Sequence, residues 1–452
     1  MTNDWDLIDD AARRARAYLE STREVRVAPA HHAVDALAEF DDELPADPAP
    51  GAATIAHLDR FGSPATVHTN GGRYFGFVNG GTNPVGLAAA MVAAAWDQNA
   101  ALPVMSPVAA RLDEIAGRWI VDLLGIPASA TAAFCAGASI ANLTAIVTAR
   151  DALLRRVGWD PAEQGLAGAP SIDVVASEEI HTSVRKALRV AGIGTGAIRP
   201  IPTDAFGRAR ADAVPATDGP KLVLLQAGNV NTGSSDPFDE IADGLDRDRC
   251  WMHVDGAFGL WANAAPDRRP FVSGVELADS WAVDGHKWLN TPYDCGVTIV
   301  ARPDELAASM TMDAAYASGG AGRSPMNLGL QMSQAARAVP VWAVLASLGR
   351  SGVADLVERC CAHAERFGLL LEAGGAEVLA PPVLNQVLVA FGDDDTTDRV
   401  VLGVQGDGTC WMGATTWKGR RAMRISVSDM ATTEVDIERS AEAVLRVWND
   451  VA

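Results

Sequence analysis

From about residue 85 onward, the sequence alternates long helix-like segments with short apolar runs. Five of these runs read SIDVVAS, KLVLLQAG, CWMHVDGA, SWAVD and GVTIVAR. They show no alternation of polar with apolar residues, which is typical of strands that are covered on both faces of a sheet. Because helical segments separate the runs, the strands are expected to be mostly parallel. The sequence therefore predicts an α/β domain built on a mostly parallel sheet.

The rest of the chain is organised around this domain. Residues 5–24 have a helical pattern, and the stretch from Pro29 to Gly51 is rich in Pro, Ala and Asp, as in an arm that wraps a partner. After Pro340, a long helical stretch leads to alternating strand-like runs and a closing helix, which predicts a small α+β domain. We predict an N-terminal helical arm over 1–74, a large domain over 75–340 and a small C-terminal domain over 341–452.

Composition argues against several classes of partner and location. A net charge of −20 disfavours nucleic acid, which proteins bind through basic patches. The most apolar stretch is interrupted at Asp97 and Gln98, short of ~20 spanning residues, and the charged N-terminus has no signal-peptide pattern. The six cysteines show no paired spacing, which fits a reducing compartment and disfavours zinc. We expect a cytoplasmic chain without a membrane span or a metal centre.

Ligands of an open parallel sheet bind outside the carboxyl ends of its strands, so residues that follow the apolar runs are site candidates. Small residues from Ala136 to Ser139 lead directly into a helix, whose N–H groups and dipole would favour an anion, with the Ser139 hydroxyl beside them. A glycine turn with a serine cap explains the same residues. His181 follows the next run near the start of a helix, where it could stack on a flat ring or be a partly exposed helix histidine.

A third run ends in Asp255, followed by Gly256 and Ala257, which leave room for a planar group against the backbone. A buried carboxylate needs a partner, and a protonated ring nitrogen would serve. The alternative is an aspartate that caps a turn.

The fourth run, SWAVD, leads into Lys287, in a chain with only four lysines. Among Trp281, Trp288 and Leu289, its amine should be desolvated, which favours the neutral nucleophile and Schiff-base formation. A lysine that extends its amine from a strand end to solvent is the plain alternative. Taken together, the four positions supply what pyridoxal 5'-phosphate (PLP) requires: a phosphate cup, a ring-stacking histidine, a partner for the pyridine nitrogen and an amine for the aldehyde.

The motifs HVDGAFG, DSWAVDGHKW and AGASIANL, in this spacing, resemble the PLP-dependent amino-acid decarboxylase family, which includes glutamate and aromatic-L-amino-acid decarboxylases. The resemblance covers the chain from about residue 70 to the C-terminus. It implies the fold-type I architecture of PLP-dependent transferases, with a seven-stranded sheet, and a homodimer with active sites at the subunit interface. It also implies an amino-acid substrate.

The resemblance assigns roles to individual residues. It implies that Lys287 forms the Schiff base and that Asp255 holds the pyridine nitrogen. The ring would lie between His181 on its near face and Ala257 on its far face. His181 and Lys287 are the predicted catalytic residues.

Four further positions complete the predicted cofactor site. The resemblance implies that Ala138, Ser139 and His286 hold the phosphate and that Asp284 lies beside the cofactor. Where the family usually has Gly-Thr-Thr after a strand, this chain has Gly-Asn-Val, so we expect Asn229 to replace the missing hydroxyl contact.

The reaction predicted from these residues is decarboxylation of an L-amino acid. Family members carry a mobile loop whose tyrosine reprotonates the product, but the segment from Gly319 to Gln331 contains no tyrosine, and Tyr316 lies just before it. The alternatives are carbon–carbon cleavage, decarboxylation with oxidative deamination to an aldehyde, or PLP binding without turnover. The sequence does not identify the amino acid.

Overall fold

The computed structural model describes residues 5–41, 43–216, 218–312 and 323–451. The chain divides into two compact units. The first comprises Met1–Gly81, His363–Leu379 and Val387–Ala452, and the second comprises Thr82–Ala362 and Ala380–Gln386. The second unit carries the cavity described below.

The second unit is built on a seven-stranded sheet with the order β1-β7-β6-β5-β4-β2-β3. Its strands are β1 (Thr131–Cys135), β2 (Asp173–Ser177), β3 (Ile198–Ile201), β4 (Lys221–Gln226), β5 (Cys250–Asp255), β6 (Ser280–Asp284) and β7 (Gly296–Val300). Neighbouring strands pair in parallel along the part of the sheet ordered β6-β5-β4-β2-β3. Strand β7 runs antiparallel to both of its neighbours, β1 and β6. Every residue of β4, β5, β6 and β7 is buried, so both faces of the sheet are covered. The predicted mostly parallel α/β sheet is confirmed.

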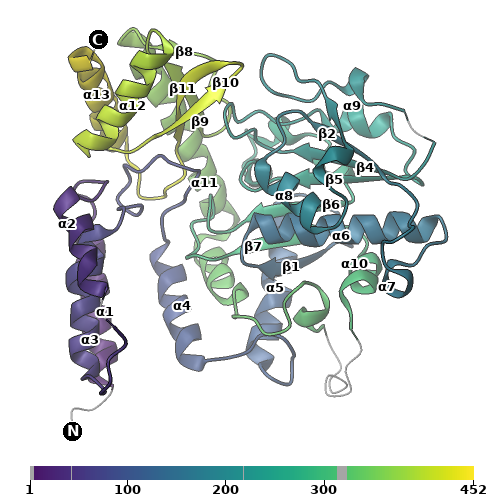
Figure 1. Cartoon of the computed structure of the whole chain (residues 1–452), viewed down its shortest axis with the longest axis horizontal. Coiled ribbons are helices and arrows are strands. Elements are labelled where there is room, and N and C mark those ends of the chain that lie inside the picture. Colours follow the sequence, from purple (N-terminus) through teal and green to yellow (C-terminus); the bar gives the residue numbers. More distant parts are fainter. Residues whose placement is uncertain (1–4, 42, 217, 313–322, 452) are drawn as a thin grey trace. The chain divides into compact units, whose positions relative to one another are not determined.

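Helices of the second unit connect and cover these strands. They are α4 (Pro84–Trp96), α5 (Pro107–Leu123), α6 (Ala138–Arg156), α7 (Pro161–Gln164), α8 (Thr182–Val190), α9 (Phe238–Asp243), α10 (Pro303–Met310) and the first part of α11 (Ala338–Ala373). Apolar side chains of α6, α8 and α10 pack with those of β2 and β4 in one core cluster. Figure 1 shows α6 and α8 in front of the strands.

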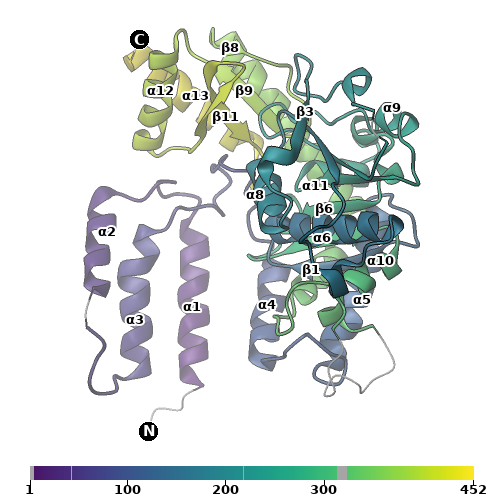
Figure 2. The same ribbon diagram turned by 45° about the vertical axis from the view of Figure 1, so that its right-hand side comes forward.

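The first unit combines N-terminal helices with a small C-terminal layer. Its elements are α1 (Asp6–Ser21), α2 (His31–Asp35), α3 (Gly51–Gly62), the last part of α11, β8 (Glu377–Val378), β9 (Gln386–Ala390), α12 (Asp394–Asp407), β10 (Gly413–Trp417), β11 (Arg420–Ser426) and α13 (Glu434–Val451). The strands form a sheet of order β10-β11-β9-β8, with antiparallel pairs at both ends. Figure 2 shows α1 and α3 side by side. The small C-terminal domain with an antiparallel sheet is therefore confirmed.

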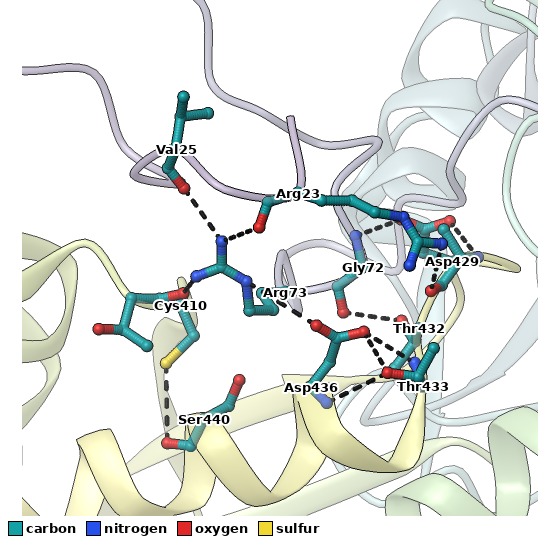
Figure 3. Close-up of polar contacts among 12 residues, drawn as sticks. Arg23, Val25, Gly72, Arg73, Cys410, Asp429, Thr432, Thr433, Asp436 and Ser440 are labelled. Carbon is teal, nitrogen blue, oxygen red and sulfur yellow. Dashed lines mark hydrogen bonds and ion pairs between the residues drawn. The ribbon is translucent and has the colours of Figure 1, made fainter. Parts of the chain in front are cut away.

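Arg73 ties the N-terminal segment to the C-terminal layer within the first unit (Figure 3). Its side chain is 1% exposed, and its Nη2 donates to the carbonyl oxygens of Arg23 and Val25 at 2.8 and 3.0 Å. The same guanidinium donates to the Thr409 carbonyl and lies 3.9 Å from the Asp436 carboxylate. These contacts hold the base of the N-terminal arm against the C-terminal layer of the same chain.

Two expectations concern the chain as a whole. Within the described ranges, no helix combines the length and the apolar character needed to cross a bilayer. The predicted division at residues 74 and 340 stays a prediction.

Candidate active site

A cavity of about 350 Å³ lies at the carboxyl ends of the strands in the second unit. Its walls come from the segments that follow β1 and β2 and from the ends of β4, β5 and β6, as ligand binding at open parallel sheets predicts. All predicted site residues except Asn229 line it: Ala138, Ser139, His181, Asp255, Ala257, Asp284, His286 and Lys287. The structure thus brings together predicted residues from four separate parts of the chain.

The turn after β1 presents the start of a long helix to the cavity. Gly137 occupies the N-cap position, and α6 continues for 19 residues from Ala138, so the positive end of its dipole lies at the cavity wall. The Ala138 N–H donates to Asp284 Oδ1 at 2.6 Å. This helix start therefore already donates to a carboxylate oxygen, and it suits a phosphate group.

His286 lies beside this turn and offers a hydrogen-bond donor. Its Nδ1 accepts from the Cys295 N–H at 3.1 Å, so the neutral ring carries its hydrogen on Nε2, which lies 3.7 Å from Asp284 Oδ2. Burial lowers the pKa of His286 and favours this neutral form. The Tyr293 ring stacks on the imidazole with centroids 4.3 Å apart and fixes its plane.

Lys287 follows β6 and reaches the cavity with an ionic partner. Its Nζ lies 3.3 Å from Asp284 Oδ2, and the lysine side chain is 20% exposed, so the amine is accessible within a mostly buried environment. The sequence pattern indicates the apolar neighbours of this lysine but not this ion pair. Asp284 therefore contacts both the helix start and the amine.

Asp255 ends β5 and is buried at the cavity wall. Its Oδ1 accepts a hydrogen bond from the Ala257 N–H at 3.2 Å. A protonated ring nitrogen would give this buried carboxylate the cationic partner that burial demands. The predicted role at the pyridine nitrogen fits this position.

His181 caps the helix that follows β2. Its Nδ1 accepts from the Ser183 N–H at 3.2 Å and lies 2.7 Å from the Ser183 hydroxyl. Because Nδ1 is the acceptor, the neutral ring carries its hydrogen on Nε2. His181 is thus held in one tautomer at the cavity wall, as a ring-stacking residue or a proton donor requires.

The end of β4 differs most from expectation. Gly228 and Val230 line the cavity, but Asn229 between them does not. The Asn229 Oδ1 accepts hydrogen bonds from the backbone N–H groups of Asn231 and Thr232. The Asn229 Nδ2 is buried without a hydrogen-bond partner among the described residues. Contact between Asn229 and the cofactor stays a prediction. Gln226, which the sequence argument missed, lines the cavity instead.

A buried chain of polar side chains connects β5, β6 and α6. The Trp251 Nε1–H donates to Ser280 Oγ at 2.8 Å, and Ser280 Oγ lies 2.9 Å from His253 Nδ1. His253 Nε2 lies 2.9 Å from Asn142 Oδ1, which can only accept, so this tautomer carries its hydrogen on Nε2. Burial lowers the pKa of His253 to about 4, so the ring is neutral. The chain links β5 and β6 to α6, the three elements that position Asp255, Asp284 and the helix start.

The predicted lid lies partly outside the described residues. Residues 319–322 of the segment Gly319–Gln331 fall outside them, as does Tyr316. In the described part, Met326 is buried against Ala101 and Leu102. Closure of this segment over the site stays a prediction.

The residues present fit PLP. The cavity has a helix start for the phosphate, an amine for the aldehyde and a buried carboxylate for the ring nitrogen. It also has a buried amide nitrogen, Gln226 Nε2, without a partner in the described part of the chain. A ring with polar substituents would satisfy these groups together.

Comparisons with known proteins point to one family. The conserved domain of pyridoxal-dependent decarboxylases matches residues 35–392. An aromatic-L-amino-acid decarboxylase from Bacillus atrophaeus is 27% identical, over 81% of this chain and 79% of that protein. A phenylacetaldehyde synthase from a Rosa hybrid cultivar is 24% identical, over 90% and 85%. The crystal structure of Oryza sativa TDC with PLP and tryptamine superposes with a TM-score of 0.90 at 22% identity, over 98% of this chain and 97% of that chain, which shows a common fold.

Proposed function

The chain belongs to the family of pyridoxal-dependent decarboxylases, and from this premise we propose that it removes the α-carboxylate of an aromatic L-amino acid as carbon dioxide. The enzyme class and the PLP cofactor follow from the family. The aromatic substrate, the residue roles and the assembly are proposals.

One observation carries the residue roles. Lys287, Asp255 and the start of α6 line one cavity, at the same edge of one sheet. PLP supplies an electron sink that accepts the electron pair left when the carboxylate departs. The protein binds the phosphate at Ala138 and Ser139, holds the ring nitrogen at Asp255 and places the amine of Lys287 at the aldehyde.

We propose that the proton returned to the product comes from a side chain at the cavity wall. His181 carries a hydrogen on Nε2 because its Nδ1 caps α8, and Lys287 is an amine next to the Asp284 carboxylate. We assign both as the groups that move protons during the reaction. His181→Gln, which cannot exchange a proton at this position, should reduce the rate of amine formation more than it reduces PLP binding.

The aromatic substrate is supported by similarity and by the cavity wall. The Bacillus atrophaeus relative is an aromatic-L-amino-acid decarboxylase, and Ile140, Val230 and Phe258 add apolar surface to the cavity. A panel of L-amino acids labelled with ¹³C in the α-carboxylate tests the proposal through the release of labelled carbon dioxide. We expect release from aromatic members and none from the Lys287→Ala variant. Release from acidic or small amino acids alone would contradict the substrate class.

A second outcome is favoured by the lid segment. Gly319 to Gln331 has no tyrosine, and the Rosa relative is a phenylacetaldehyde synthase. In this outcome the amino acid, oxygen and water give the aldehyde, carbon dioxide, ammonia and hydrogen peroxide. Measuring amine, aldehyde and peroxide against labelled carbon dioxide in one reaction distinguishes the two: peroxide equal to carbon dioxide supports the aldehyde route, and amine equal to carbon dioxide supports simple decarboxylation.

We also propose a homodimer. Helix α1 buries none of its residues and α4 buries only Gly86, so their apolar side chains remain exposed, among them Ile8, Met91 and Trp96. A symmetric partner would cover such surfaces. Light scattering at micromolar concentration should give twice the chain mass, and a Met91→Glu substitution should shift the protein towards monomer. A monomeric wild type would contradict the proposal.

A cytoplasmic location is the corresponding proposal for the cell. All six cysteines are free and buried, as is usual for proteins of reducing compartments. Fractionation of the source cells, with detection of the chain by antibody, tests it, and recovery outside the cytoplasmic fraction would contradict it.

A further inference from the structure

Gln226 is a buried residue of the cavity wall to which no role has been assigned. It is the last residue of β4, lines the cavity and is 4% exposed. Its Nε2 is buried and has no hydrogen-bond partner among the described residues. Buried amide donors nearly always have a partner, and because Gln226 lines the cavity, a turn of its amide about the last side-chain torsion brings this donor to a ligand there.

The backbone of Gln226 is held firmly on both sides. Its N–H donates to Asp236 Oδ2 at 2.8 Å, and its carbonyl oxygen accepts from the Asp236 N–H at 3.1 Å. The next residue, Ala227, donates its N–H to the carbonyl oxygen of Asp255 at 2.9 Å. The end of β4 is therefore fixed to the end of β5, and the Gln226 side chain starts from a rigid base.

Gln226 is also the direct neighbour of Asp255 across the sheet. The two residues are register partners on the parallel strands β4 and β5. Register partners of parallel strands project to the same face, and neighbouring strands lie about 4.8 Å apart. A ring held at Asp255 therefore lies on the face of the sheet to which the Gln226 side chain projects.

The order of the strands decides which edge of the ring Gln226 meets. Along the sheet, the helix start lies at β1, Lys287 at β6, Asp255 at β5 and Gln226 at β4. In PLP, the phosphate arm and the 3-oxygen lie on opposite sides of the axis that joins the ring nitrogen to the aldehyde carbon. With the phosphate towards β1, the nitrogen at Asp255 and the aldehyde at Lys287, the 3-oxygen edge lies towards β4.

We propose that Gln226 donates a hydrogen bond through Nε2 to the 3-oxygen of bound PLP. The proposal rests on PLP and on the placement of its nitrogen at Asp255, but not on the substrate or the reaction. A hydrogen bond to this oxygen stabilises its anionic form, because hydrogen bonds to charged acceptors are stronger than neutral ones. Gln226 would thus tune the ring that accepts electrons, and it would contribute to cofactor affinity.

The test compares two cofactors on two proteins. Apo wild type and Gln226→Met, which keeps the side-chain length and removes the donor, are titrated with PLP and with 3-deoxypyridoxal 5'-phosphate, which lacks the 3-oxygen. We expect the variant to bind PLP about tenfold more weakly and to bind the deoxy analogue as the wild type does. The midpoint of the pH-dependent change in the visible absorption of bound PLP should move to higher pH in the variant.

Two further variants make the comparison specific. Gln405→Met removes a partly buried amide of the first unit that donates to the Met412 carbonyl oxygen at 2.7 Å and does not line the cavity, so it should leave both affinities and the absorption midpoint unchanged. Gln226→Glu places a negative charge beside the 3-oxygen and should weaken PLP binding more than Gln226→Met does. It also provides the comparison if the methionine variant does not fold.

Several results would overturn the proposal. Equal weakening for PLP and the deoxy analogue would show that Gln226 acts through the fold of the cavity. Unchanged PLP binding and an unchanged absorption midpoint in a folded variant would show that the amide does not contact the 3-oxygen. Because no substrate is present, a failure of the proposed decarboxylation would leave these readouts unaffected, so the two failures are distinguishable.

Discussion

Replacing Gly296 by alanine should weaken PLP binding, although Gly296 itself does not line the cavity. Gly296 begins β7 and is the register partner of both Cys135 and Asp284. A Cβ at this position would lie 2.4 Å from the Cα and the carbonyl carbon of Gly137. Carbon atoms in contact are about 3.5 Å apart, so the backbone of Gly137, and with it the start of α6, must move by about 1 Å.

The magnitude follows from this displacement. Overpacking of this kind costs about 1–3 kcal/mol of unfolding free energy. A shift of about 1 Å at a binding turn can cost on the order of a hundredfold, so we expect the PLP dissociation constant to rise by about tenfold to a hundredfold. Fluorescence titration of the apo protein with PLP measures the affinity, and urea unfolding measures the stability.

A matched substitution controls for the added methyl group. Gly406 lies within α12, and a Cβ there would meet no atom within 4 Å. Gly406→Ala should therefore leave PLP binding unchanged and stabilise the helix by up to about 1 kcal/mol. If Gly296→Ala binds PLP as tightly as the wild type, the turn before α6 does not hold the phosphate.

Two further predictions concern β5. Asp255→Ala should lower turnover by about a hundredfold and Asp255→Glu by less, because only the alanine removes the charge at the ring nitrogen. Steady-state kinetics that place both variants within a few-fold of the wild type would refute this role. Burial lowers the pKa of His253 from 6.5 to about 4. Between these two pH values, the unfolded chain takes up a proton at this residue that the folded chain does not. The free energy of unfolding should therefore fall by about 3 kcal/mol as the pH decreases from 6.5 to about 4. His253→Gln should lack this contribution in urea unfolding at several pH values, and equal pH dependence of the two proteins would contradict it.

The sequence predicted the parts of this protein that follow from local pattern. Buried strands such as β4 and β5 contain unbroken apolar runs, and parallel strands bring their carboxyl ends to one edge. Lys287 and Asp255 could therefore be placed together although 32 positions separate them. The closing helix was also predictable, because α13 begins at Glu434, directly after Thr433, whose hydroxyl donates a hydrogen bond to the Asp436 carboxylate.

Contacts between distant segments were not predictable. The bond from Ala138 to Asp284 joins residues 146 positions apart, and it depends on how β1 and β6 are placed around β7. Gln226 carries no local signal, because glutamine side chains are mostly exposed in proteins. Only its register with Asp255 gives it a place in the site. Helix α12 was missed because its polar first turn reads as a loop, although Asp393 caps it by accepting from the Thr396 N–H.

The central claim is that PLP is bound through Lys287 in this cavity. Borohydride reduction of the holoenzyme, followed by digestion and mass spectrometry, locates the covalently attached cofactor directly. The account predicts one pyridoxyl label, on Lys287, and its loss in the Lys287→Ala variant. A label on Lys186, Lys221 or Lys418 in the wild type would contradict the assignment of the active site.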